Sequence, residues 1–164
     1  MTEPDSAQEI ERKFRVEPDA LPFSLEGRSA SRIEQGYLAV EGAQAREVRI
    51  RNRDGHYTLT TKTGHGEVRG EGEVALSAEQ FQTLWPFTEG RRIAKTRYEI
   101  DLAELTAELD IYASRHTGLA VVEVEFADEV AARRFDPPDW FGDEVTDNAV
   151  YKNQRLALAL GPPE

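Results

Sequence analysis

The first residues able to do chemistry lie close to the N-terminus, in the run Glu9-Ile10-Glu11-Arg12-Lys13-Phe14. Alternate side chains of a β-strand point to the same side, so a strand here presents two carboxylates and one ammonium group on one face. Neighbouring carboxylates repel each other unless a cation neutralises them, and Mg²⁺ and Mn²⁺ prefer carboxylate oxygen. One interpretation is a divalent-cation site beside an anion-binding lysine; the other is a solvated strand face.

The same alternation of charged and apolar residues recurs along the chain. Like charges two residues apart repel, so unmixed rows favour a site where each row meets an opposite charge, a metal or a polyanion. In one arrangement the apolar faces point inward and the charges face water. In the other, which we favour, the charges line the inside of a wide barrel. The rows are Glu9/Glu11, Arg49/Arg51/Arg53, Lys62 after Thr58 and Thr60, Glu71/Glu73, Lys95/Arg97, Glu108/Asp110 and Glu123/Glu125.

Short strands must position these rows. Asp54-Gly55 predicts a hairpin, and Ser77 with Gln80 predicts a capping box at a helix start. At 164 residues with no dividing linker, we expect one domain over residues 1–164. Because no βαβ alternation is visible, the expected class is mainly β (α+β): a closed eight-stranded antiparallel β-barrel, or tunnel, with a charged interior and flanking helices. The expected strands are about 9–14, 32–40, 46–53, 56–62, 67–76, 91–101, 108–114 and 119–126, and the expected helices are 78–85, 129–135 and a C-terminal helix at about 148–160.

The amino-acid composition limits the classes of binding partner and the cellular location that we expect for this protein. The 164 residues carry a net charge of −11, which argues against non-specific nucleic-acid binding. The chain has no cysteine, and no apolar run approaches the roughly 20 residues of a membrane span. Residues 1–8 are polar and acidic, unlike a targeting peptide. We therefore expect a cytoplasmic protein without a membrane or nucleic-acid partner, and an oligomer is compatible with these features.

A barrel lined by acidic and basic rows suits a polyphosphate that carries divalent metal. Acidic rows hold the metal, arginine forks match phosphate oxygens in pairs, and lysine acts as a point charge. Metal and cationic side chains then stabilise the charge that develops as a P–O bond breaks. A single orthophosphate would not need so many basic residues.

Taken in order, these motifs resemble the CYTH superfamily, also called the triphosphate tunnel metalloenzymes. The resemblance runs from Glu9 to about Leu158 and implies an eight-stranded tunnel, a small-molecule triphosphate substrate and dependence on Mg²⁺ or Mn²⁺, with two ions expected. It is strongest to short bacterial inorganic triphosphatases. Its motifs are Glu9-x-Glu11-x-Lys13, Gln35-Gly36-Tyr37-Leu38, Arg49-x-Arg51, Lys62, Glu71-x-Glu73, Lys95-x-Arg97, 118–126, and Glu144-Val145-Thr146 continuing to Tyr151-Lys152-Asn153.

The resemblance implies a role for each row. The metal ligands would be Glu9, Glu11, Glu71, Glu73, Glu123 and Glu125, with Asp110 as a further ligand or a water-orienting group. The triphosphate would contact Lys13, Arg49, Arg51, Lys62, Lys95 and Arg97. Lys13, Lys62 or Lys95 would polarise the scissile phosphate, and the sequence does not choose among the three. Tyr37 is interpreted as a packing residue.

Hydrolysis of inorganic tripolyphosphate is the leading functional hypothesis. A class IV-type adenylate cyclase would use the same ligands with a ribose oxygen as nucleophile, and a thiamine triphosphatase would add a pocket for the organic group. A non-catalytic polyphosphate-binding module is the non-enzyme alternative. The three Glu-x-Glu pairs speak against that module, because binding a polyanion does not require so many carboxylates.

Overall fold

The computed structural model describes residues 9–41, 46–63 and 70–164. Its strands are β1 (Ile10–Val16), β2 (Ala30–Glu41), β3 (Arg46–Arg53), β4 (His56–Thr63), β5 (Gly70–Leu76), β6 (Arg92–Leu102), β7 (Leu105–Tyr112) and β8 (Ala120–Phe126). The helices are α1 (Ala78–Leu84), α2 (Glu129–Arg134) and α3 (Asn153–Leu158), with short 3-10 segments η1 (Pro18–Ala20), η2 (Trp85–Thr88), η3 (Ser114–His116) and η4 (Ala149–Tyr151). Residues 67–69 of the expected fifth strand lie outside the described residues.

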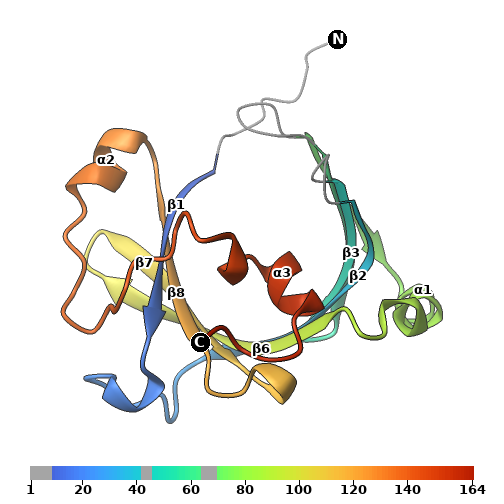
Figure 1. Cartoon of the computed structure of the whole chain (residues 1–164), viewed down its shortest axis with the longest axis horizontal. Helices are drawn as coiled ribbons and strands as arrows, with labels where there is room; N and C mark the ends of the chain where they lie inside the picture. The colour runs from blue at the N-terminus through green and yellow to red at the C-terminus, as the bar shows by residue number, and fades with distance from the viewer. Residues whose placement is uncertain (1–8, 42–45, 64–69) are drawn as a thin grey trace.

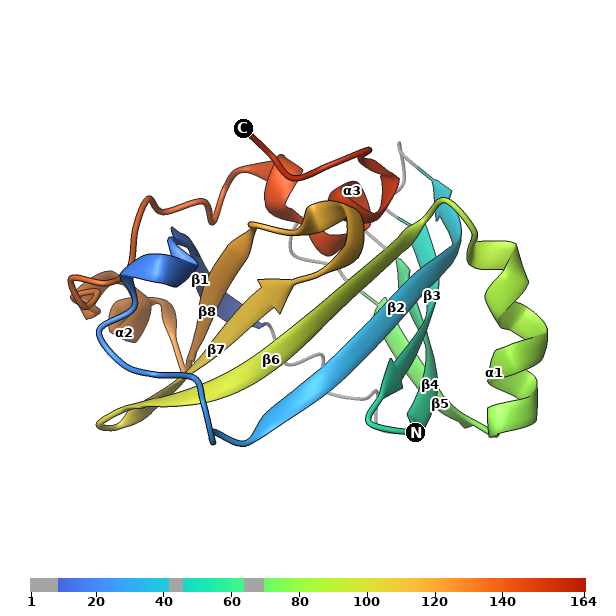
Figure 2. The same cartoon turned by 90° about the horizontal axis from the view of Figure 1, so that it is seen from below.

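All eight strands form one antiparallel sheet in the order β1-β8-β7-β6-β2-β3-β4-β5. The sheet is strongly curled, and α3 lies on its concave side (Figures 1 and 2). Within the described ranges no ladder joins β1 to β5, so these two strands are the edges and the expected closed barrel is not confirmed. Alternation specifies which face a side chain occupies, whereas closure depends on strand stagger and tilt, which the pattern does not encode.

Two local predictions are confirmed. Asp54 and Gly55 both have positive φ, 50° and 85°, as a two-residue hairpin loop between β3 and β4 requires. At the start of α1, the Ser77 hydroxyl accepts from the Gln80 amide while the Gln80 side chain accepts from the Ser77 amide. This reciprocal capping box satisfies backbone donors that the first helical turn leaves without partners.

The main apolar core lies on the convex side of β1, β8 and β7. Phe14, Leu109, Val122 and Val124 are almost fully buried there, and the segment 129–141, which includes α2, packs over them. Phe14 and Phe141 contact each other with ring centroids 5.0 Å apart. The apolar face of these strands therefore packs outward, as the favoured interpretation requires.

The C-terminal helix expected at about 148–160 is wrong in extent. Lys152 has an extended backbone (φ −67°, ψ 134°) that separates η4 from α3. Both Tyr151 and Leu156 are buried, and they join Tyr37, Tyr112 and other residues in a second apolar cluster. A straight helix would satisfy the amphipathic pattern, but burying both side chains against a curved sheet bends the chain at Lys152. In the described residues, no helix is long and apolar enough to cross a membrane.

Candidate active site

The strand register brings the charged rows side by side on the concave face. Glu11 lies opposite Glu125 and Lys13 opposite Glu123 across β1 and β8. The row continues around the sheet through the pairs Glu108–Glu123, Arg97–Asp110, Lys95–Ile33, Gln35–Arg51, Arg49–Thr60, Thr60–Glu73 and Lys62–Glu71. Val74, on the opposite face of β5, is instead 57% exposed. The rows therefore converge across one surface.

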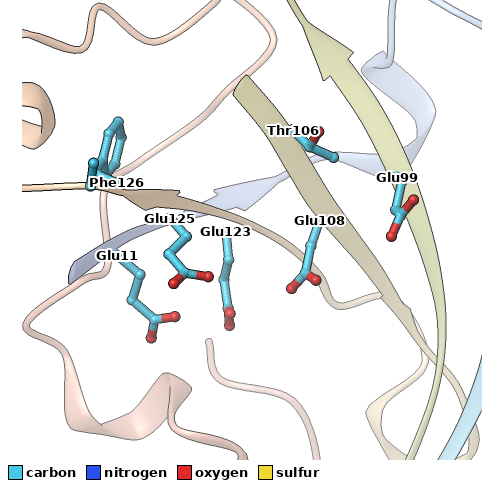
Figure 3. Close-up of a pocket in the computed structure, with 8 residues that line it drawn as sticks. Glu11, Glu99, Thr106, Glu108, Glu123, Glu125 and Phe126 are labelled. Carbon is cyan, nitrogen blue, oxygen red and sulfur yellow. The ribbon is translucent and has the colours of Figure 1, made fainter. Parts of the chain in front are cut away.

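Carboxylates line one side of this surface. Glu11, Glu108, Glu123 and Glu125 point the same way into a cavity of about 490 Å³, which Glu99 also lines (Figure 3). Burial by the surrounding protein and the charge of Glu123 raise the pKa of Glu11, although its side chain is still open to solvent. A carboxylate that resists ionisation beside other carboxylates is one that a cation would stabilise.

The donor set fits a divalent cation by its chemistry, since Mg²⁺ and Mn²⁺ take carboxylate oxygens. The site is not preformed: in the parts of the chain that the structure describes, no three acidic or histidine side chains lie close enough together to bind one metal ion. Lys13 supplies the nearest counter-charge, with Nζ 3.0 Å from Glu123 and 3.4 Å from the Tyr151 carbonyl oxygen.

Arginine and lysine side chains from β3 and β4 line the other side. Arg51 donates from Nε to Gln35 at 2.7 Å, and Arg53 donates to Ser31 at 3.2 Å. Burial and the nearby cations Arg49 and Arg97 lower the pKa of Arg51. Arg49 contacts Glu47 at 3.4 Å, and its buried Nε has no hydrogen-bond partner within the described residues. Crowded cations of this kind would be stabilised by a polyanion.

Lys95, Arg97 and Asp110 form a buried triad. Asp110 is 1% exposed; it lies 2.5 Å from Lys95 Nζ and accepts from Arg97 Nε and Nη2 at 2.7 and 2.8 Å. Burial alone would raise the pKa of Asp110, but Lys95 and Arg97 hold it below its ordinary value. Arg97 also contacts Glu108 at 2.6 Å.

The triad bears on three expected site residues. Asp110 already has two cationic partners, which argues against its expected role as a metal ligand. Lys95 is 2% exposed, and burial lowers its pKa. Its ammonium group is buried against Asp110 and does not face the open cavity. Arg97 keeps a partly exposed side chain, held by carboxylates on both sides.

The remaining expected ligands divide between the two sides. Glu11, Glu123 and Glu125 share the cavity, and Glu9, which directly precedes β1, adds to the rise in the Glu11 pKa. Glu71 and Glu73 lie on β5 beside the basic strands, and Glu73 accepts from Thr60 at 3.1 Å. Lys62 lies opposite Glu71, and its positive charge partly offsets the rise in the pKa of Glu11.

Sequence reasoning missed two residues of this surface. Glu99 shares strand parity with Lys95 and Arg97, and that parity could have placed it on the cavity wall. Gln35 shares parity with Tyr37 and lies in a motif that the sequence singles out, yet an uncharged amide gave no signal of its own. Glu99 belongs to a strand whose charged row was recognised, whereas β2, which carries Gln35, has no such row.

Comparisons with known proteins agree with this geometry. The CYTH domain matches residues 7–146. The chain is 43% identical over 153 residues to an inorganic triphosphatase of Nitrosomonas europaea, covering 93% of this chain and 98% of that one. It is 33% identical over 150 residues to an inorganic triphosphatase of Acetivibrio thermocellus, covering 91% and 92%.

Solved structures agree as well. A crystal structure of an inorganic triphosphatase superposes with a TM-score of 0.73 at 42% identity, covering 93% of this chain and 96% of that one. A Pyrococcus furiosus protein shares the fold at 20% identity, with a TM-score of 0.52 over 76% and 82% of the two chains. This chain belongs to the CYTH domain family.

Proposed function

We propose that this protein hydrolyses inorganic triphosphate to pyrophosphate and phosphate with the help of divalent cations. The observation that carries the proposal is the strand register, which places acidic and basic rows on the same concave face. The acidic side of that face contains the cavity that Glu11 and Glu123 line. Two relatives that align over more than nine-tenths of the chain bear the name inorganic triphosphatase. The curled sheet would wrap the substrate as a tunnel.

The two walls have separate tasks. Glu11, Glu123 and Glu125, with Glu9 nearby, would hold Mg²⁺ or Mn²⁺, in a site with room for two ions. When bound, such a cation neutralises phosphate oxygens and helps water to attack phosphorus. Glu71 and Glu73 remain candidates for contacts with cations that the substrate itself carries.

The basic wall would bind and orient the triphosphate. Arg49 and Arg51 offer planar guanidinium donors, and Lys13 and Lys62 offer point charges near the acidic side. These lysines are better placed than Lys95 to polarise the scissile phosphate, because Lys95 is buried against Asp110. Arg97, held between Asp110 and Glu108, would contribute positive charge on the concave face beside Glu108.

The amino-acid composition supports a cytoplasmic location and a small-molecule substrate, which we also propose. A net charge of −11 disfavours nucleic acid as substrate, and the absence of cysteine suits a reducing cytoplasm. The substrate is therefore taken to be a free small molecule rather than the end of an RNA chain.

The test is phosphate release from tripolyphosphate, ATP, thiamine triphosphate and pyrophosphate, each with Mg²⁺ and with Mn²⁺. We expect metal-dependent release from tripolyphosphate above the other substrates. Glu11→Gln should lower kcat/KM at least about 100-fold, since it removes a charge-bearing oxygen ligand, whereas Glu79→Gln on exposed α1 should leave it unchanged. No turnover of tripolyphosphate with either metal, or cyclic AMP formed from ATP as the main product, would refute the proposal.

A further inference from the structure

We propose that Gln35 is a positioning residue that fixes the guanidinium of Arg51 for the triphosphate by bridging Arg51 to Tyr37. The inference deepens the proposed function and depends on it. Gln35 is 0% exposed, which is unusual for a polar side chain, yet it lies on the concave face that carries the charged rows. A buried amide costs stability unless its donors and acceptors find partners.

Both ends of the amide have partners on this face. Arg51 Nε donates to Gln35 Oε1 at 2.7 Å, and Gln35 Nε2 donates to the Tyr37 hydroxyl at 2.7 Å. Arginine has only donors, so the amide oxygen must face Arg51 and the amide nitrogen must face Tyr37. The orientation of Gln35 is therefore determined by its neighbours, and it can act as a rigid link between them.

Strand register explains why this link can form. Gln35 on β2 lies directly opposite Arg51 on β3, and Tyr37 follows two residues later on the same face. Opposite side chains in an antiparallel pair are close enough to interact, and residues i and i+2 share a face. The three groups thus meet without any contribution from loops.

Tyr37 anchors the link to the C-terminal segment. It is 1% exposed and packs with Tyr112, Val121 and Leu156, the last of which belongs to α3. Burial raises the pKa of Tyr37 to about 12, so its hydroxyl stays neutral and accepts from Gln35 throughout the neutral range. The packing of α3 therefore supports the hydroxyl that holds Gln35.

The consequence for binding concerns the mobility of Arg51. The bond to Gln35 engages only Nε, while phosphate recognition by a guanidinium uses paired N–H donors in a fixed plane. A long side chain that is already immobilised loses less entropy when the ligand arrives. Without Gln35, Arg51 would have to be ordered by the substrate itself, and apparent affinity would fall.

The test compares Gln35→Met with wild type in steady-state hydrolysis of tripolyphosphate. Methionine has a similar length and removes both hydrogen bonds. We expect KM to rise about tenfold while kcat changes less than about twofold, since an ordering cost affects substrate and transition state alike. Gln82→Met on the exposed surface of α1 is the matched control and should change neither parameter.

A double-mutant cycle separates positioning from general stability. If Gln35 acts through Arg51, then Gln35→Met should change KM less than about twofold in an Arg51→Ala background. Equal effects of Gln35→Met in both backgrounds, or a fall in kcat with KM unchanged, would overturn the inference. Tyr37→Phe keeps the ring packing and removes the hydroxyl, so it serves if Gln35→Met does not fold. Because that hydroxyl also interacts with Arg49, Tyr37→Phe is compared in the wild-type and Arg51→Ala backgrounds. It should raise KM about threefold, and an unchanged KM would also count against the link.

The role of Gln35 can be tested separately from the proposed hydrolysis of triphosphate. If the wild-type protein releases no phosphate, the proposed hydrolysis fails by itself. Calorimetric titration of the same variants with tripolyphosphate then tests Gln35 separately, with about a tenfold weaker Kd expected for Gln35→Met. Equal Kd values for wild type and Gln35→Met would overturn the inference whatever the catalytic result.

Discussion

Asp110→Asn tests the buried triad most directly. Asparagine has nearly the same shape as aspartate, so the substitution removes the charge and creates little cavity. Asp110 is 1% exposed and lies within 2.5 to 2.8 Å of three nitrogen atoms from Lys95 and Arg97. Its loss leaves the ammonium of Lys95, itself 2% exposed, without its carboxylate partner.

The expected cost is large because an uncompensated buried charge is more costly than the intact pair. Removing one partner of a buried ion pair typically lowers the free energy of unfolding by about 3–5 kcal/mol. For a chain of 164 residues, each kcal/mol shifts the melting temperature by about 2–4 °C. We therefore expect Asp110→Asn to lower Tm by about 10 °C at pH 7.

The pH dependence provides a second check. Because the cations hold the pKa of Asp110 below its ordinary value, its contribution is fully present above the pKa of an unfolded aspartate, about 3.9. That contribution is lost as pH falls through the lower folded-state pKa. The stability difference between wild type and Asp110→Asn should therefore shrink in acid below about pH 4.

Urea unfolding followed by circular dichroism, between pH 2.5 and 7, measures both effects. Asp101→Asn, at an exposed position on β6, is the matched control and should change stability by no more than about 0.5 kcal/mol. A loss below about 1 kcal/mol at pH 7, or a difference that persists undiminished at pH 2.5, would refute the structural role assigned to Asp110.

Two further substitutions test how η2 and α3 are held. Gly36→Ala should cost about 1–3 kcal/mol, since a Cβ at this position would lie 2.5 Å from the side chain of Thr88, which is fully buried; calorimetric Tm measures it, and an unchanged Tm contradicts the close approach. His116 is buried with Nε2 2.6 Å from the Leu156 carbonyl oxygen, and burial lowers its pKa. The native state therefore favours neutral His116, and unfolding free energy should decrease as pH falls below about 6.5, the ordinary histidine pKa. His116→Gln should lack that decrease in urea titrations from pH 5 to 8, and an identical slope in both proteins would contradict it.

The residue pattern of the chain is enough to assign side chains to the faces of the strands and to identify the family. The side-chain period of a strand is two, so the alternation in 9–14 or 122–126 specifies which residues share a face without reference to any other strand. The hairpin at Asp54-Gly55 and the capping box at Ser77 are also local, because backbone conformation and nearby hydrogen bonds decide them. These predictions are confirmed for that reason.

Which charged side chains contact each other depends on the order and register of the strands. Asp110 and Glu123 look alike in the sequence, but strand order places Asp110 opposite Arg97 and Glu123 opposite Lys13 and Glu108. The burial of Gln35, the bend at Lys152 and the absence of a β1–β5 ladder among the described residues likewise depend on contacts between distant segments. Strand parity is a local property, whereas the register and order of strands are set by the whole sheet, so the sequence could identify the charged rows but not their partners.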